Sequence, residues 1–574
     1  MSSPIVSAES IGMRFRSAMK IEVLTIALVA LSQSVFAQQP PSAGGQIQQI
    51  PPPPIQQRTP PEIQIDKGGA PTLPVADDVK IIVNKLQVSG QTVYSESELL
   101  ATTGFKPGSE SNLAQLRATA LKIADHYHSN GYFVAQVFLP AQDIKDGAVT
   151  FTVIEGRYGK VTLRNSTNLS DSLVNSRLGG LNSGDIIAIA PLEERLLLLS
   201  DIPGVIVKST LVPGASLGTS DLIVDVTPGQ RVTGSVEADN AGNRYTGVNR
   251  IGATTNINNL TGHGDVAALR VLTSGPGLTY ARASYQVMLG RATAGVAYSL
   301  VDYRLGMEFS NLQAHGTAEI GSIYGSYPLI RSRNTSLYAT VAFDAKKFQD
   351  KVDSTAPPGL TDKNARLLMM GLNGDHRDGL GGGGYSGYSA TWTTGDIDIR
   401  TPVARAADAA TAQSNGNFNK LGFQAMRLQN LGGPFSLYAA IRGQVATKNL
   451  DVSEKMELGG VSAVRAYPEG EAYADEGYVV NLEAKMLLPK PSERMPGQVQ
   501  LIGFADTGSV TPNRNPWTGG QTSRTLSGAG MGLTWEDYNN FSVKAYWAHK
   551  MGSAIALSVP DAASRFWVQF VKYF

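Results

Sequence analysis

The C-terminal part of the chain alternates apolar and polar side chains over segments of roughly ten residues, the length of a membrane-spanning β-strand. In residues 435–446, Leu437 and Ile441 face one way, whereas Tyr438 and Arg442 face the other. This alternation fits a barrel with lipid outside and water inside, and a soluble sandwich with its apolar faces inward would show it too. The strand length and the Tyr and Phe residues near strand ends favour the membrane barrel.

The alternating part divides into sixteen segments separated by Gly, Asn, Asp and Pro, and an even number lets both ends of a barrel face the same compartment. The predicted strands are 231–239, 247–257, 264–274, 278–290, 293–303, 320–328, 335–346, 364–374, 384–394, 417–428, 434–446, 476–488, 497–507, 524–535, 540–550 and 564–574. Residues 230–574 are therefore expected to form one transmembrane barrel of about sixteen antiparallel strands.

The first 37 residues have the three parts of a secretory signal peptide. Arg14, Arg16 and Lys20 precede an apolar core, and Ala37 offers a small residue at the cleavage site. A buried helix is the alternative interpretation. The chain has no cysteine, which excludes disulfides and thiolate metal sites and suits a bacterial envelope, where free thiols are oxidised. No apolar run reaches the ~18 residues of a spanning helix, so an α-helical membrane protein is excluded.

Residues 38–77 form a Pro- and Gln-rich segment with four consecutive prolines at 51–54. Proline fixes φ and removes a hydrogen-bond donor, so this segment is expected to be an extended linker without a long helix. Two roles stay open at this point: a tether or plug that passes through a pore, or a disordered leader.

Residues 78–157 and 158–229 repeat one β-α-α-β-β pattern, which indicates one kind of α+β module used twice. In the first module, Ser95 and Glu98 have the spacing of a capping box. In the second, Ser170 is expected to cap a helix, and Pro191 to open the next one. The predicted elements are strands 79–88, 133–139 and 148–154 around a helix at 113–127, then strands 160–163, 205–211 and 222–226 around helices 171–178 and 191–199.

The charge balance and the motifs of the chain do not indicate an enzyme or a nucleic-acid-binding protein. Lys plus Arg is 49 and Asp plus Glu is 48, so the basic excess typical of nucleic-acid binding is missing. His126 and His128 lie two apart on a helix and so do not share a face as metal ligands do. The glycines at 381–384 lack the Lys-Ser/Thr of a phosphate loop. We predict no catalytic residue, no metal site and no cofactor.

Five motifs, in family order, resemble the two-partner secretion outer-membrane transporters (TpsB, or ShlB-FhaC-HecB, type) of the Omp85 superfamily. They are residues 131–147 with 154–156, 199–205 with 212–214, 239–247, 464–467 and 504–508. The first two sets are similar to the two POTRA domains of that family, the third to its first barrel hairpin, and the last two to its inward loop and facing strand. The resemblance covers about residues 78–574. It implies POTRA 1 at 78–157, POTRA 2 at 158–229, and an inward loop at 447–476.

The resemblance also implies which residues hold the inward loop. The loop motif is Val464, Arg465, Ala466 and Tyr467, and its anchoring strand carries Phe504, Asp506 and Gly508. A desolvated guanidinium needs a carboxylate, which accepts it bidentately, and the family pattern gives Asp506 that part. Glu483 is a weaker alternative partner, and a solvated lumen charge is the remaining alternative. Ala466 stands where the family usually has Gly, so a positive φ there would cost about 1 kcal/mol.

The chain end and the first module supply the other candidate residues. Phe574 resembles the terminal signal by which outer-membrane barrels are sorted by the barrel assembly machinery, although Lys572 departs from that signal. Binding of an unfolded partner by strand addition is expected at POTRA edges. The candidate partner-binding residues are Tyr132, Phe133, Leu139, Pro140 and Gln142.

The function that the resemblance implies is a monomeric pore in the outer membrane of a Gram-negative bacterium. It would recognise a large unfolded partner, such as an adhesin, a cytolysin or an iron-acquisition protein, in the periplasm and pass it to the cell surface without ATP. The alternative is an Omp85 factor that inserts barrels into outer-membrane lipid. A passive porin or receptor would not need POTRA-like modules.

Overall fold

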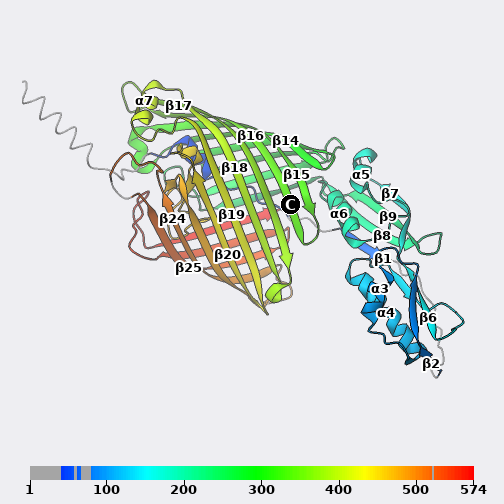
Figure 1. The fold of residues 1–574 in the computed structure, drawn as a ribbon. Helices are drawn as coiled ribbons and strands as arrows, with labels where there is room; N and C mark the ends of the chain where they lie inside the picture. The colour runs from blue at the N-terminus through cyan, green and yellow to red at the C-terminus, as the bar shows by residue number, and fades with distance from the viewer. Residues whose placement is uncertain (1–39, 57–60, 66–78, 491, 520–521) are drawn as a thin grey trace, which may run out of the picture.

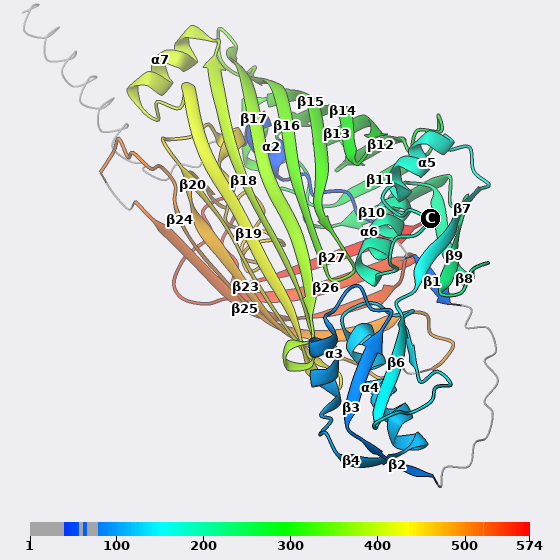
Figure 2. The same cartoon turned by 45° about the vertical axis from the view of Figure 1, so that its right-hand side comes forward.

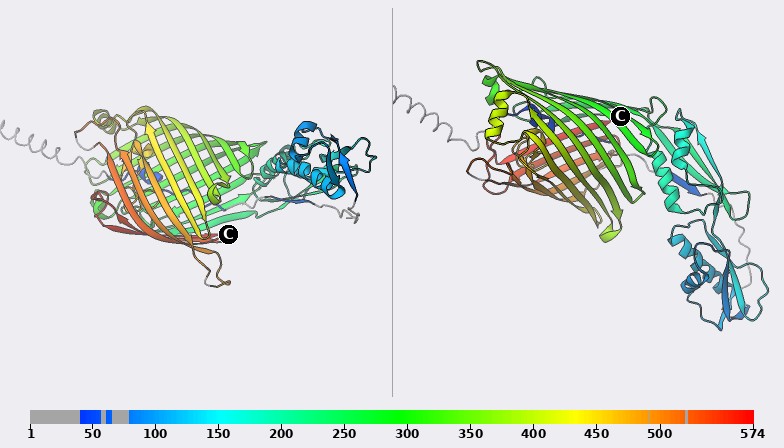
Figure 3. Two further views of the ribbon diagram at one scale, coloured as in Figure 1. Left: turned by 60° about the horizontal axis from the view of Figure 1, so that its bottom comes forward. Right: turned by 45° about the horizontal axis from the view of Figure 1, so that its top comes forward.

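The computed structural model describes residues 40–56, 61–65, 79–490, 492–519 and 522–574. A large barrel occupies the C-terminal part, and two small α+β domains lie one after the other beyond one of its ends (Figures 1 and 3). The signal peptide predicted over residues 1–37 lies outside the described residues. Among the described residues, no helix is long and apolar enough to cross a membrane.

The barrel closes from sixteen antiparallel strands, each paired with the next along the chain and the last with the first. The strands are β10 (Val232–Asp239), β11 (Arg250–Asn258), β12 (Val266–Thr273), β13 (Leu278–Leu289), β14 (Ala292–Arg304), β15 (Ala314–Arg331), β16 (Thr335–Val352), β17 (Gly359–Asp378), β18 (Gly384–Ile399), β19 (Gly416–Gly432), β20 (Phe435–Ala446), β23 (Glu476–Leu487), β24 (Gln498–Thr511), β25 (Arg524–Asp537), β26 (Phe541–Lys550) and β27 (Ser564–Tyr573). On β16, Val341 and Phe343 face outward and are exposed, whereas Lys346 and Asp350 face the lumen. The predicted sixteen-stranded barrel is confirmed.

Several strands are longer than predicted. β15, β16 and β17 have 18, 18 and 20 residues, whereas the expected segments were 320–328, 335–346 and 364–374. A membrane needs about ten residues per strand. The hydrogen-bond ladders of these strands continue beyond the membrane. The outward face there no longer needs apolar side chains, so the alternation of apolar and polar residues that predicts a strand is lost.

The ring closes between β10 and β27. Their register runs from Ser235 opposite Tyr573 to Asp239 opposite Gln569. Phe574 extends the pairing, since its N–H donates to the Gly234 carbonyl at 3.1 Å and its carbonyl accepts the Gly234 N–H at 2.9 Å. A side chain at Gly234 would begin 2.6 Å from the Phe574 ring, so glycine leaves room for that ring.

The first small domain contains β2 (Lys80–Val83), β3 (Lys85–Ser89), α3 (Glu96–Thr103), β4 (Ser109–Asn112), α4 (Leu113–Ser129), β5 (Gln136–Phe138) and β6 (Ala148–Ile154). The single strand expected at 79–88 is broken at Asn84, because the Gly147 carbonyl accepts the N–H groups of both Asn84 and Lys85. Ser95 caps α3, accepting the Glu98 N–H at 3.2 Å. Asn112 and Gln115 form a full capping box on α4 that the sequence analysis did not anticipate.

The second small domain contains β7 (Arg157–Asn165), α5 (Asp171–Leu178), α6 (Ile189–Ser200), β8 (Val205–Pro213) and β9 (Thr219–Pro228). Ser170 caps α5 as expected. α6 begins at Ile189, so Pro191 stands third in the helix and not first, still within the turn that needs no N–H donor. Both domains pair one strand parallel and one antiparallel with their last strand, which gives them one topology.

Part of the Pro-rich segment belongs to the second domain. Residues 62–65 form β1 (Glu62–Ile65), which adds parallel to β8, so that the sheet order is β1-β8-β9-β7. Ile63 packs against the apolar core of that domain. The Ser209 hydroxyl also donates to the Glu62 carbonyl at 3.2 Å.

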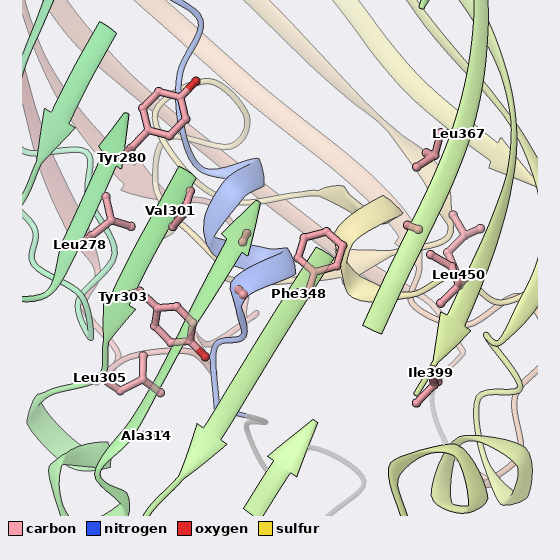
Figure 4. Packing of buried hydrophobic residues seen from close by; sticks show 14 of the residues in the cluster. Leu278, Tyr280, Val301, Tyr303, Leu305, Ala314, Phe348, Leu367, Ile399 and Leu450 are labelled. Carbon is pink, nitrogen blue, oxygen red and sulfur yellow. The ribbon is translucent and has the colours of Figure 1, made fainter. Parts of the chain in front are cut away.

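Another part of that segment lies inside the barrel. The short helix α2 (Ala43–Gln48) rests against the inner wall, near Tyr303 and Phe348 (Figures 2 and 4). From α2 the chain runs along the lumen, where Arg250 donates to the Gln49 carbonyl and Arg270 to the Pro51 carbonyl. Gln56 then reaches the Phe574 carbonyl at 3.1 Å, at the end of the barrel that faces the small domains.

Ion pairs join the second domain to the barrel. Arg331 donates two hydrogen bonds to Asp201, at 2.8 and 2.9 Å, and Arg333 pairs with Glu193 at 2.7 Å. Arg291 pairs with Glu194 on the same helix as Glu193. Arg291 and Arg333 lie in turns between barrel strands and Arg331 ends β15, so the second domain is attached directly beneath the barrel wall.

Candidate functional site

The inward loop lies between β20 and β23 and folds back into the lumen. It contains the short helix η3 (Val452–Glu454) and a small hairpin of β21 (Met456–Glu457) and β22 (Tyr473–Ala474). Its tip packs into an apolar cluster with the wall that includes Leu458, Val464, Tyr467 and Ile502. All four motif residues, Val464 to Tyr467, are buried.

Arg465 and Asp506 make the central contact of this site. The guanidinium donates to both carboxylate oxygens of Asp506 at 2.8 Å, and the Arg465 backbone N–H adds a third hydrogen bond at 3.1 Å. The two side chains are 5% and 0% exposed. The structure therefore brings together the two residues that the family resemblance paired, in the bidentate geometry that arginine and carboxylate favour.

Glu483 and two rings complete the surroundings of Arg465. The third guanidinium nitrogen donates to Glu483 at 2.7 Å, so the alternative partner is an additional one. The Phe504 ring lies under the guanidinium, 3.6 Å from its carbon to the ring centroid. Asn481 donates to Asp506 at 2.8 Å and fixes the carboxylate from its other side. Every guanidinium nitrogen thus has a carboxylate partner while the group remains buried, which lowers the cost of removing it from water.

The motif residues of β24 are two positions apart, which places them all on the face of the strand that contacts the inward loop. Phe504, Asp506 and Gly508 alternate along β24, so all three face the lumen. A side chain at Gly508 would begin 2.5 Å from Leu458 of the inward loop. Gly508 therefore lets the loop approach the wall at the level next to the Arg465–Asp506 contact.

Ala466 does not have the strained backbone that a glycine replacement could have implied. It is absent from the residues with positive φ, and its side chain is fully buried. A side chain at Gly528 on β25 would begin 2.4 Å from the Ala466 methyl carbon. Gly528 lies opposite Asp506 in the sheet, so a glycine on the wall provides the space that the Ala466 side chain occupies.

Two further hydrogen bonds hold the motif. The Trp567 indole N–H donates to the Arg465 carbonyl at 2.7 Å, and the Tyr467 hydroxyl donates to the Ala554 carbonyl at 2.8 Å. Trp567 belongs to the last strand, and Ala554 to the loop before it. Neither residue is recognisable as a contact of the motif from the sequence, because an indole on a strand carries no signal of its lumen partner.

Two acidic residues at the base of the inward loop, Asp451 and Glu454, are paired with cations of the wall. Glu454 accepts Lys346 at 2.7 Å and Lys420 at 2.9 Å, and Asp451 accepts Lys363 at 2.8 Å. These lysines come from β16, β19 and β17. These ion pairs attach the base of the loop to the wall.

The loop at residues 551–563, between β26 and β27, folds onto the inward loop. The Glu471 carboxylate accepts the N–H groups of Leu557 at 2.8 Å and Ser558 at 3.2 Å, and it pairs with Arg524. The Tyr245 hydroxyl donates to the Ser558 carbonyl at 2.5 Å. This loop covers the inward loop at the end of the barrel opposite the small domains.

Helix α2 contacts both the wall and the inward loop. The Ala43 N–H donates to Asp350 on β16 at 2.8 Å, and the Gln48 amide donates to the Val452 carbonyl of the loop at 2.8 Å. A side chain at Gly44 would begin 2.8 Å from the Ser453 side chain. Displacement of α2 would therefore break contacts to the inward loop as well as to the wall.

The five partner-binding candidates in the first domain have structural contacts. Gln142 donates to the Thr150 carbonyl at 2.8 Å and accepts the Thr150 N–H at 2.9 Å, so its amide continues the strand pairing of β6. Phe133 packs against the core of the second domain. Tyr132 and Leu139 pack against the first domain's own core, and Pro140 is half-buried beside them. The exposed apolar residues at this edge are Phe138 and Ile144, which the sequence analysis did not select.

A buried carboxylate organises the first domain near its junction with the second. Glu155 accepts the N–H groups of Thr92 and Val93 at 2.6 and 2.7 Å, and the Tyr127 hydroxyl at 3.1 Å. Burial raises the pKa of the Glu155 carboxyl, but these hydrogen bonds outweigh burial and hold the pKa below its usual value. Burial also raises the pKa of the Tyr127 hydroxyl, which stays protonated as a donor.

No group of three or more His, Asp or Glu side chains placed to hold a metal ion occurs in the described parts of the chain. The described site consists of buried contacts between the inward loop and the barrel wall.

A model of the family described as haemolysin secretion/activation protein ShlB/FhaC/HecB matches residues 218–535. The chain belongs to this family. A model described as POTRA domain, ShlB-type, matches residues 81–156, which hold the first small domain. Members of the ShlB/FhaC/HecB family and their relatives are outer-membrane transporters that secrete partner proteins, and their POTRA domains are periplasmic. The chain is accordingly an outer-membrane transporter, and the barrel end beside the small domains faces the periplasm.

Relatives within and near the ShlB/FhaC/HecB family can be aligned with most of this chain. The protein named Heme/hemopexin transporter protein HuxB from Haemophilus influenzae strain 86-028NP is 29% identical over 95% of this chain and 97% of its own. HuxB from strain ATCC 51907 is 30% identical over 81% of this chain and 82% of its own. The outer membrane transporter CdiB from Dickeya dadantii is 23% identical over 69% and 70% of the two chains.

Solved structures show the same fold. CdiB from Escherichia coli has a TM-score of 0.66 at 19% identity, with all of both chains covered. BamA from Haemophilus ducreyi lacking POTRA domains 1–3 has a TM-score of 0.53 at 15% identity, with 86% of this chain and all of the other covered. The fold of this chain is therefore the one seen in CdiB and in this BamA structure.

Proposed function

We propose that the two POTRA domains recognise an unfolded partner by strand addition and that the partner then crosses the barrel lumen. The observation that carries this proposal is β1, because four residues of the linker already add to the edge strand β8 through main-chain pairing. Strand addition makes few demands on sequence, which suits recognition of an unfolded chain.

The first POTRA domain offers a second edge of the same kind. β5 pairs with β6 on one side, and no strand of the described chain pairs with its other side. Phe138 on β5 is 40% exposed, and Ile144 follows at 39%. An extended apolar segment could therefore gain both main-chain hydrogen bonds and side-chain burial at this edge.

The linker strand competes with a partner for the β8 edge. A partner that adds to β8 must displace Glu62–Ile65, which follow helix α2 of the lumen in the chain by 13 residues, 49–61. Partner binding in the periplasm would thus loosen the segment that fills part of the passage. We infer that export needs no ATP, because the free energy of partner folding outside the cell can drive transport in one direction.

The proposed partner is a large secreted protein, and one involved in haem acquisition is favoured over an adhesin or a cytolysin. The basis is the name of the relatives at 29% and 30% identity, Heme/hemopexin transporter protein. We further propose that the transporter acts as a monomer, since all sixteen barrel strands pair within one chain. Delivery to the membrane by the barrel assembly machinery through Phe574 is part of the same proposal.

The test uses the absence of cysteine from the chain. Gln64 and Thr210 are register partners in the β1–β8 pair, so the double variant Gln64→Cys with Thr210→Cys can cross-link β1 to β8. Oxidised cells should secrete less partner per unit of barrel in the membrane, and reduction should restore secretion. Each single cysteine variant is the control. Equal secretion in the oxidised and reduced double variant would contradict the proposed use of the β8 edge.

Deletion of residues 79–156 distinguishes export from membrane assembly. The deletion removes the first POTRA domain, which has its own core. We expect loss of partner from the medium with unchanged amounts of other outer-membrane barrels. A general fall in those barrels would instead support the assembly-factor alternative.

A further inference from the structure

Helix α7 (Pro402–Ala410) lies at the rim of the barrel, at the end opposite the POTRA domains (Figures 1 and 2). A pocket of about 320 Å³ lies beside it. It is formed by residues from β17, β18, α7 and the start of β19. Its charged lining residues are Arg366, Asp396, Asp398, Arg400 and Arg405. Its volume is at the low end of the range for ligand sites.

The charged side chains of the pocket belong to the outer face of the barrel. Arg366 alternates with the buried Ala365 and Leu367, and it shares its face with Leu368 and Met370, which are exposed. On β18, Asp396 and Asp398 likewise share a face with the exposed Trp392. The pocket therefore opens on the side of the barrel that contacts lipid.

The height of the pocket places it at the edge of the apolar belt. Arg366 is two residues beyond Leu368 on the same strand, which is about 7 Å. This rim faces the cell exterior, because the POTRA domains lie at the other end. The outer leaflet of a Gram-negative outer membrane consists of a glycolipid whose headgroup sugars carry phosphate, so headgroups meet the barrel at this level.

Two guanidinium groups of the pocket form no ion pair within the described residues, although Asp396 lies opposite Arg366 in the sheet register. Arg400 pairs with Asp398 at 3.6 Å. Within the described residues, Arg366 and Arg405 have no ion pair and no side-chain hydrogen bond, and both are exposed. Three arginines against two aspartates leave the pocket with a net positive charge. Arginine offers a planar fork of donors that matches phosphate oxygens.

We propose that this pocket binds a phosphate group of the outer-leaflet glycolipid, with Arg366 and Arg405 as the donors and Arg400 as a third positive charge. Asp396 and Asp398 oppose the ligand and set its affinity. Bound lipid would join β17 and β18 to α7 on the outer wall. The site is independent of the POTRA edges and of the inward loop.

The test measures binding of diphosphoryl lipid A to the purified full-length protein in detergent by native mass spectrometry. The triple variant Arg366→Gln, Arg400→Gln, Arg405→Gln should bind at least tenfold more weakly than the wild type. Its matched control, Lys85→Gln, Lys160→Gln, Lys208→Gln, removes the same charge from exposed POTRA residues and should bind as the wild type does. Heat-modifiable gel mobility shows whether each barrel is folded.

A second variant and three other probes make the result decisive. Asp396→Asn with Asp398→Asn removes repulsion and should bind lipid A more tightly. Dephosphorylated lipid A and phosphatidylglycerol should bind at least tenfold more weakly than diphosphoryl lipid A, and inorganic phosphate should not compete at equal concentration. The proposal is overturned if the triple variant binds as the wild type does, if dephosphorylated lipid A binds equally, or if free phosphate competes fully.

Discussion

Arg465 on the inward loop and Asp506 on β24 are joined by three hydrogen bonds, although 41 residues separate them in the chain. One of the three comes from the backbone N–H of Arg465, so the carboxylate positions the loop backbone as well as its side chain. A change at either residue therefore affects the position of the loop tip.

Arg465→Ala should reduce secretion while the barrel still reaches the membrane. Removing one member of a buried ion pair costs about 3–5 kcal/mol, here because Asp506 is left buried without its main partner. The measurement is partner in the medium per unit of transporter in the membrane. Glu483→Gln leaves the Asp506 contact in place and should have a smaller effect, and a wild-type ratio for Arg465→Ala would show that the contact is not needed for secretion.

Gly528→Ala should displace the inward loop, because the new methyl carbon would lie 2.4 Å from that of Ala466. Overpacking of this kind costs about 1–3 kcal/mol. Adding Ala466→Gly removes the clash and should restore part of secretion, the carbonyl oxygen of His549 at 3.1 Å limiting the recovery. Gly503→Ala on β24 is the control, since nothing lies within 4 Å of that position. Equal loss in the single and double variants would contradict the predicted contact.

Glu471→Gln should loosen the loop at 551–563. The carboxylate accepts hydrogen bonds from Leu557 and Ser558 and pairs with Arg524. Loss of a charged hydrogen bond costs about 1.5–3 kcal/mol, or roughly ten- to a hundredfold in the population of the released loop. Single-channel recordings in planar bilayers should show more frequent openings. Glu308→Gln, at an exposed pair with Arg244, should leave the recordings unchanged.

Glu155 should make the first POTRA domain sensitive to acid. Hydrogen bonds hold its pKa below the ordinary carboxyl value, so it contributes stability above that value, and this stability is lost as the pH falls through the folded-state pKa. Thermal unfolding of a fragment of residues 79–229 should show this loss, and Glu155→Gln should be less stable at neutral pH with a flatter acid side. Glu110→Gln, at an exposed pair with Lys80, should follow the wild type at every pH.

The sequence predicted the strands of the barrel better than their ends. The two-residue period marks each strand where one face meets lipid, and all sixteen predicted segments fall on observed strands. The extensions of β15, β16 and β17 carry polar residues such as Lys347 and Lys351 on their outward face, so the lipid-facing period is lost there, although Ala318 and Phe348 on the inner face are buried. The break between β2 and β3 at Asn84 could not be predicted from the local sequence either, since it depends on the distant Gly147 carbonyl.

The candidate site was predictable where a motif carried it. Arg465 and Asp506 were paired by resemblance, whereas Gly528 opposite Ala466 could not be read from the sequence, because only the sheet register brings them together. Helix α2 and strand β1 were missed for a different reason. Neither has a strong local signal, and both exist because a wall or an edge strand holds them.

The position of α2 has a consequence for how the molecule is made. Residues 40–56 lie within a closed ring that the same chain forms from residues 232 to 573. The N-terminal segment of the chain therefore lies inside the barrel that the rest of the chain forms. Closure of the ring between β10 and β27 must be coordinated with the placement of this segment. Either the N-terminal segment is laid in place before the last strand closes the ring, or it must enter the finished ring end first. A bulky folded domain fused ahead of α2 would obstruct the second route and leave the first open. The topology therefore links the size of whatever precedes α2 to the order in which the barrel can be assembled.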